Sequence, residues 1–158
     1  MKVRLTLGLA ALCTAATLPV VLAQGGPQTP EQQAEQAVKV RKAVFDVQAY
    51  SFGPVGAMLK GAPFNAEAAV KAAMRIQMTS SLIPEVFNFD TRKFMVMTKA
   101  REGIWTNKAD FDMDAKNLQT AAENLEAAAK TGDKGATLKA AGAVGKACGS
   151  CHDEFREK

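Results

Sequence analysis

The 158-residue chain is long enough for one domain with a sizeable core, and its formal net charge is only +4. Such a weak basic bias gives no reason to expect nucleic acid or an anionic membrane as a partner. Hydrophobic residues make up 47% of the chain, yet no segment has the alternation of a strand, which predicts an all-α fold.

The first 23 residues have the organisation of a secretory signal peptide. Lys2 and Arg4 give a basic start, a long apolar run follows, and Val21-Leu22-Ala23 ends it with a cleavable pattern. A membrane anchor is the alternative, but the run is short for a span and a polar linker follows it. We therefore predict a signal peptide at residues 1–23 that is cleaved after Ala23, a flexible linker at 24–28, and no membrane attachment afterwards.

The first helix is predicted to begin at Thr29. This residue suits an N-cap, Pro30 suits the first helical position, and Gln32 completes a capping box. Because proline disrupts a helix interior, we expect a kink or break at Gly53-Pro54. The apolar stripe predicted to face the core comprises Ala37, Val40, Val44 and Val47, widened by Val38, Phe45 and Ala49.

A second helix is predicted from Asn65, a plausible N-cap, to about Pro84. Its predicted apolar stripe consists of residues four apart, Val70, Met74, Met78 and Leu82, with Ala66, Ala69, Ala73 and Ile76 beside them. The periodicity then fades, so residues 87–107 are predicted to form a long, partly structured connection with Trp105 as a packing anchor.

Two further helices complete the chain. Asp110 is the predicted cap of the third, and Thr131-Gly132-Asp133 is predicted to separate it from the fourth. The clearest stripe in the sequence belongs to the third helix and comprises Phe111, Ala115, Leu118, Ala122, Leu125 and Ala129. Four helices with mostly short connections predict an antiparallel up-down-up-down four-helix bundle over residues 29–158. The many alanines on its facing stripes leave space that a bulky cofactor would fill.

The segment Cys148-Gly149-Ser150-Cys151-His152 has the C-x-x-C-H signature of covalent c-type haem attachment. On a helix both cysteines and the histidine share one face, so the thiols would bond the haem and His152 would ligate its iron. A zinc site is disfavoured because about four ligands are needed, and Cys13 lies in the predicted signal peptide. A thioredoxin-like pair would require a βαβ pattern, which is absent from the sequence.

His152 is the chain's single histidine, so a second histidine ligand from the same chain is impossible. A methionine would be the usual sixth ligand of an electron-transfer cytochrome, but residues 38–50 of the first helix contain none. If haem lies between the first and last helices, Phe45 and its neighbours Arg41, Gln48 and Ala49 face its open side. A peroxidase-like enzyme is disfavoured because no distal histidine could move protons.

Three segments together resemble the cytochrome c′ family: Cys148-x-x-Cys151-His152-Asp153-x-Phe155-Arg156, Val40-Arg41-x-x-Val44-Phe45 followed by Ser51-Phe52-Gly53-Pro54, and Ile104-Trp105. The resemblance spans essentially all of the chain after the signal peptide. It implies one five-coordinate, high-spin haem c with His152 as proximal ligand, binding of nitric oxide and carbon monoxide, and a homodimer formed through the first two helices.

The resemblance also matches Phe45 to the family's bulky distal residue and Arg156 to its basic residue beside the proximal histidine. From the residues alone, Phe45 could equally be an ordinary core phenylalanine, and Arg156 a solvated residue favoured by the helix dipole. Arg41 could pair with a haem propionate or point into solvent.

The predicted function is therefore that of an exported, periplasmic haem protein that binds nitric oxide for sequestration or resistance, without substrate turnover, and that exchanges electrons with an unidentified redox partner. The alternative is a six-coordinate, low-spin electron-transfer cytochrome of the same bundle.

Overall fold

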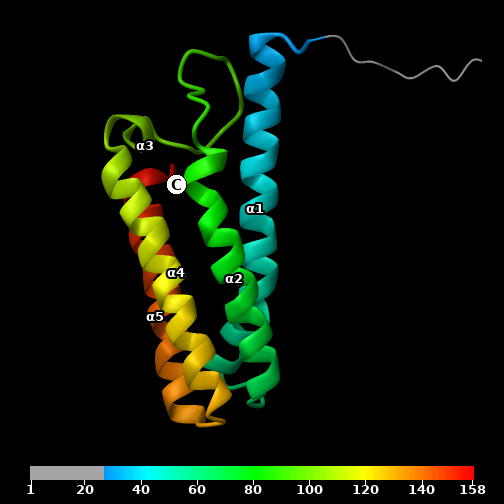
Figure 1. Cartoon of the computed structure of the whole chain (residues 1–158), viewed down its shortest axis with the longest axis vertical. Helices are drawn as coiled ribbons and strands as arrows, with labels where there is room; N and C mark the ends of the chain where they lie inside the picture. Colours follow the sequence, from blue (N-terminus) through cyan, green and yellow to red (C-terminus); the bar gives the residue numbers. More distant parts are fainter. Residues whose placement is uncertain (1–26) are drawn as a thin grey trace, which may run out of the picture.

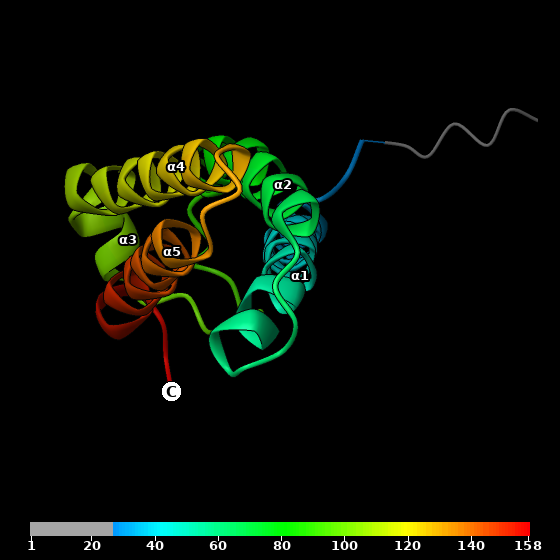
Figure 2. The same cartoon turned by 90° about the horizontal axis from the view of Figure 1, so that it is seen from below.

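The computed structural model describes residues 27–158, so the predicted signal peptide and most of the predicted linker lie outside the described residues. The helices are α1 (Pro30–Leu59), α2 (Ala66–Val86), the single turn α3 (Gly103–Thr106), α4 (Lys108–Lys130) and α5 (Lys134–Phe155). The four long helices run alternately down and up (Figure 1) and follow one another around the bundle in the order α1, α2, α4, α5 (Figure 2). The predicted four-helix bundle is confirmed.

Helix α1 begins at the predicted residue and continues past Pro54 through Met58 and Leu59, as the sequence predicts. Thr29 Oγ1 accepts a hydrogen bond from Gln32 N (3.2 Å), and the Gln32 side chain accepts one from Thr29 N (2.9 Å), which completes the capping box. A break at this point is excluded, because α1 continues through Pro54 to Leu59. Pro54 is exposed on the outside of α1, where water can solvate the backbone carbonyl that loses its partner, while Val55 next to it is fully buried.

The core faces of α1 and α2 agree only in part with the predicted stripes: Val38, Val44, Ala69, Ala73 and Ile76 are buried as predicted. Of the large apolar residues predicted to face the core, Val47 is 47% exposed and Met78 is 68% exposed. On α2 the buried residues are mostly small or polar: Ala69, Ala72, Ala73, Ile76, Thr79, Ser80 and Ile83. Small side chains let the α2 backbone approach its neighbours closely, so the larger residues lie on the opposite face.

Helix α4 confirms the prediction for its core face in full. Its buried residues are Phe111, Ala115, Leu118, Ala122, Leu125 and Ala129. The predicted cap is wrong, because α4 begins at Lys108 after the N-cap Asn107, and Asp110 lies in its first turn. Asp133 does cap α5, and its side chain accepts a hydrogen bond from Ala136 N at 2.7 Å.

The connection from α2 to α4 lies at the end of the bundle where α1 begins and α5 ends (Figure 1). Trp105 anchors it, since the indole Nε1 donates a hydrogen bond to the Phe87 carbonyl at 2.9 Å. Ala100 forms an isolated antiparallel bridge with Arg156, just past the end of α5. Over residues 27–158, no helix is both long enough and apolar enough to span a bilayer.

Candidate haem site

The attachment motif lies in the last two turns of α5, as predicted. Cys148 and Cys151 are free, half-buried and packed against the core, whereas His152 is exposed at the surface of its turn. Burial raises the pKa of both thiols, to about 12 for Cys151, where the nearby Asp114 carboxylate adds to the effect. Both groups are therefore neutral thiols at pH 7. Neither is in a disulfide, so both can bond to a cofactor.

Two cavities flank the motif, between α5 and the middle of α1. One has a volume of about 360 Å³ and the other about 210 Å³. Both are lined by Phe45, Ala49, Cys151 and His152, so they form two parts of one space that is divided where α1 faces α5. The larger part extends toward the end of α5, and the smaller part extends into the bundle along α2 and α4.

Phe45 and His152 meet at the division between these two parts. Their ring centroids are 6.4 Å apart and their planes are inclined at 73°, an edge-to-face contact. Desolvation by neighbouring residues of the chain lowers the pKa of His152, with a further contribution from Arg156, which favours the neutral imidazole that can ligate a metal. The structure thus brings together the predicted proximal residue and the predicted distal residue.

The two parts differ in chemical character. Around the larger part stand four cationic side chains, Arg41, Lys42, Lys99 and Arg156, with Asp46 as the one carboxylate. Around the smaller part stand Cys148, Cys151 and mostly apolar residues, with Gln48, Asp114 and His152 as the polar ones. A haem has an apolar vinyl edge and an anionic propionate edge, so the thiols and cations lie where the two edges of a haem would need them.

Arg41 does not point into solvent, which was one of its two predicted positions, because only 3% of its surface is exposed. Its guanidinium donates hydrogen bonds to the carbonyl oxygens of Val86 (2.9 Å) and Phe89 (2.5 Å) and to Thr91 Oγ1 (3.0 Å). Burial lowers the pKa of Arg41 to about 10, which still leaves it charged at neutral pH. Arg41 therefore joins α1 to the end of α2 and to the segment that follows.

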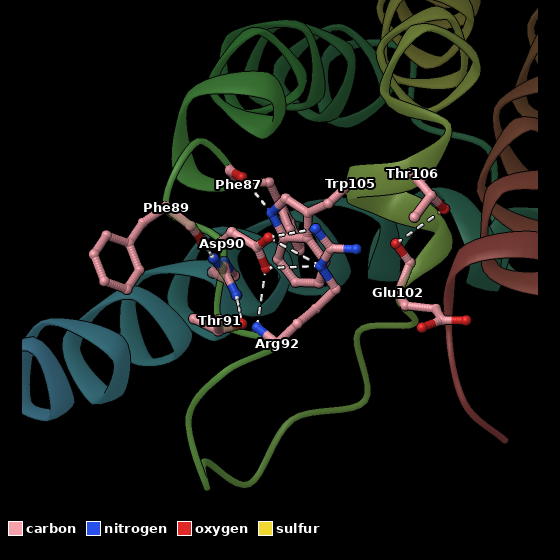
Figure 3. Close-up of polar contacts among 9 residues, drawn as sticks. Phe87, Phe89, Asp90, Thr91, Arg92, Glu102, Trp105 and Thr106 are labelled. Carbon is pink, nitrogen blue, oxygen red and sulfur yellow. Dashed lines mark hydrogen bonds and ion pairs between the residues drawn. The ribbon is translucent and has the colours of Figure 1, made fainter.

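Aromatic rings and a second arginine surround this junction. The Arg41 guanidinium lies 4.5 Å from the centre of the Phe87 ring, and that of Arg92 lies 5.9 Å from the centre of the Trp105 ring. Figure 3 shows Arg92 paired with Asp90, and Trp105 bonded to the Phe87 carbonyl. The turn after α2 is thereby held rigidly beside the cavity.

Several lining residues were not identified from the sequence. Thr98, Lys99 and Ala100 contribute from the irregular connection, where no periodicity indicates which side chains face inward. Asp114 contributes from α4, one residue before the predicted core position Ala115. Arg156, which was predicted, lines the larger part from its exposed position after α5.

The fold and the site define a class of protein: a four-helix bundle whose last helix carries a c-type haem attachment motif beside a cavity. Residues 36–156 match the family described as Cytochrome C'. Cytochrome c′ of Rubrivivax gelatinosus is 36% identical over 128 residues, which cover 80% of this chain and 98% of that protein.

Two solved structures are similar over nearly their whole length. Cytochrome c prime from Shewanella frigidimarina has a TM-score of 0.73 and 35% identity, covering 79% of this chain and 97% of that one. A nitric oxide complex of a mutant cytochrome c prime from Alcaligenes xylosoxidans has a TM-score of 0.70 and 32% identity, with coverages of 79% and 97%. The chain belongs to the cytochrome c′ family, and its cofactor is c-type haem.

Proposed function

We propose that this protein binds nitric oxide and carbon monoxide at a five-coordinate haem c, with His152 as the proximal ligand and nitric oxide sequestration or resistance as its role. The observation that carries the proposal is the position of the Phe45 ring, which lies edge to face with His152 where the two parts of the cavity meet. When bound, the haem iron supplies the position at which a small diatomic gas coordinates.

The residues of the chain have separate tasks in this proposal. Cys148 and Cys151 fix the cofactor covalently, and the neutral imidazole of His152 offers its lone pair to the iron. Phe45 has no hydrogen-bond donor for a bound gas and occupies the opposite side, so its ring must move before a ligand enters. Arg41 and Arg156 stand beside the larger part of the cavity, where a propionate would find a positive environment.

The alternative, a low-spin cytochrome with a methionine ligand, has less support. Neither part of the cavity is lined by a methionine from residues 27–158. Met58 is buried in the core and accepts a hydrogen bond from Asn65 N, while Met74, Met78, Met95, Met97 and Met113 are exposed. A redox exchange with a partner protein remains compatible with the five-coordinate state.

The similarity to a solved nitric oxide complex supports the choice of ligand class. The test is the optical spectrum of the reduced protein with and without carbon monoxide. A five-coordinate site gives broad high-spin bands that sharpen and shift when the gas is added. Sharp low-spin bands that carbon monoxide leaves unchanged would establish the electron-transfer alternative instead.

The outer face of the α1 and α2 pair is the proposed homodimer interface. It carries a set of large exposed apolar side chains: Val40, Val47, Tyr50, Met74, Met78 and Leu82. These residues lie on two adjacent antiparallel helices (Figure 2), where a symmetric copy would cover them. The periplasm is the proposed location, with residues 1–23 removed as the signal peptide, which an intact-mass measurement of the secreted protein would test.

A further inference from the structure

Helix α5 ends one turn after His152, whose carbonyl still accepts a helix-ladder bond from the Arg156 N–H at 3.2 Å. The carbonyls of the last three residues of α5 need partners from outside the ladder. All three are satisfied by Arg101. Its Nη1 donates to the carbonyls of Asp153 (2.9 Å) and Glu154 (3.1 Å), and its backbone N–H donates to that of Phe155 (3.0 Å).

Further contacts tie the same segment to the end of α5. Glu157 N donates to the Lys99 carbonyl at 2.8 Å, and Ala100 forms its antiparallel bridge with Arg156. The Nε atom of Arg101 lies 3.4 Å from Glu157 Oε1. The chain at residues 99–101 therefore lies across the last turn of α5 as a short strap, with a positive charge at the negative end of the helix dipole.

The position of this strap matters for the site. Lys99 and Ala100 line the larger part of the cavity, so the strap connects the cavity wall directly to the turn that carries His152. Helix ends fray unless their terminal groups are bonded, and His152 lies in the terminal turn of α5. Whatever fixes that turn also fixes the imidazole relative to Phe45.

We propose that Arg101 is the positioning residue for His152: by bonding the terminal carbonyls of α5, it holds the imidazole in the orientation in which it ligates the haem iron. This inference rests on the proposed role of His152 as proximal ligand. Arg101 acts only through the α5 backbone and touches neither the iron nor the gas.

The experiment compares holoprotein carrying Arg101→Gln with the wild type and with Arg92→Gln. Arg92 is the matched control, since it is an arginine in the same connection. It pairs with Asp90 and makes no hydrogen bond or ion pair with α5 within residues 27–158. Two quantities are measured: amide hydrogen exchange over residues 152–158, and the iron–histidine stretching band of the reduced, gas-free protein by resonance Raman spectroscopy.

In Arg101→Gln we expect exchange at residues 152–158 to accelerate about tenfold, as follows from losing charge-assisted hydrogen bonds, and the band to broaden and shift to lower frequency. Arg92→Gln should change neither. Arg101→Lys keeps the charge but not the planar fork, so it should restore part of both signals. This variant also provides the comparison if Arg101→Gln yields no folded holoprotein.

The outcomes separate the two proposals. Faster exchange with an unchanged iron–histidine band would show that Arg101 only caps the helix. That result would overturn its positioning role and leave the proposed function standing. A wild-type protein without any iron–histidine band would refute the five-coordinate haem with His152 as its ligand, on which both proposals rest. Equal effects of the Arg92 and Arg101 variants would also overturn the inference.

Discussion

The ring of Phe45 and the imidazole of His152 face each other edge to face, 6.4 Å between centroids, at the point where the two parts of the cavity meet. Residues from the first and last helices thus stand on opposite sides of the proposed haem position. In the proposed function, His152 would hold one face of the cofactor and the Phe45 ring would cover the other.

Replacing Phe45 with alanine should accelerate carbon monoxide binding to the reduced protein by about tenfold or more, which corresponds to about 1.4 kcal/mol removed from the barrier. The reason is that the ring no longer has to move aside. Stopped-flow absorbance measures the rate. Phe89→Ala is the control, because Phe89 stacks on Phe94 outside both parts of the cavity. Unchanged rates in Phe45→Ala would show that this ring is not the gate.

Replacing both Cys148 and Cys151 with serine should abolish covalent haem attachment, since no other cysteine lies in residues 27–158. A haem stain after denaturing electrophoresis detects only the covalently bound cofactor. Each single variant should keep one bond and a weaker stain. Haem retained by the double variant would contradict the assignment of these two thiols.

Arg41→Gln should lower the free energy of unfolding by about 2–4 kcal/mol, because buried carbonyl oxygens and Thr91 lose a charged donor. Chemical denaturation followed by circular dichroism measures the change. The exposed Arg75 on α2 offers a matched control, and Arg75→Gln should stay within about 0.5 kcal/mol of the wild type. Similar losses in both variants would argue against a special role for Arg41.

The Asp90 carboxylate predicts a small dependence of stability on pH. Its hydrogen bonds to the Arg92 side chain hold its pKa below the usual value, so the folded state favours the ionised form. This contribution is present above the unfolded pKa and is lost as the pH falls through the folded pKa. Asp90→Asn should therefore be less stable than the wild type at pH 7, and the difference should vanish in acid. A pH-independent difference would exclude the ion pair as its cause.

Met78→Glu should convert the proposed dimer into a monomer, because it places a charge in the apolar face of α1 and α2. Sedimentation velocity measures the assembly state. Met113→Glu on α4 is the matched control, since Met113 is similarly exposed but lies on another helix. A wild type that sediments as a monomer at all concentrations would contradict the dimer itself.

By itself, the sequence determined the elements whose signals are local. The C-x-x-C-H motif, the capping box at Thr29 and the α4 stripe each depend on residues within a few helical turns, and each has its predicted place in the structure. Predictions from such local patterns hold in the folded protein because hydrogen bonds between near neighbours and helical periodicity do not depend on the rest of the chain.

Only the tertiary structure decided which faces of α1 and α2 are buried. Both helices carry apolar residues on two sides, so periodicity alone could not choose between them. Packing left Val47 and Met78 outside, and on α2 it buried mostly small residues. Arg41 is buried where it donates to carbonyls at the end of α2 and in the connection that follows, and Arg101 of that connection donates to a carbonyl at the end of α5. The connection has no periodicity from which either contact could be predicted. Contacts of that kind arise when segments far apart in the sequence meet, which is why the motif predicted the cofactor but not the residues that hold the haem ligand in position.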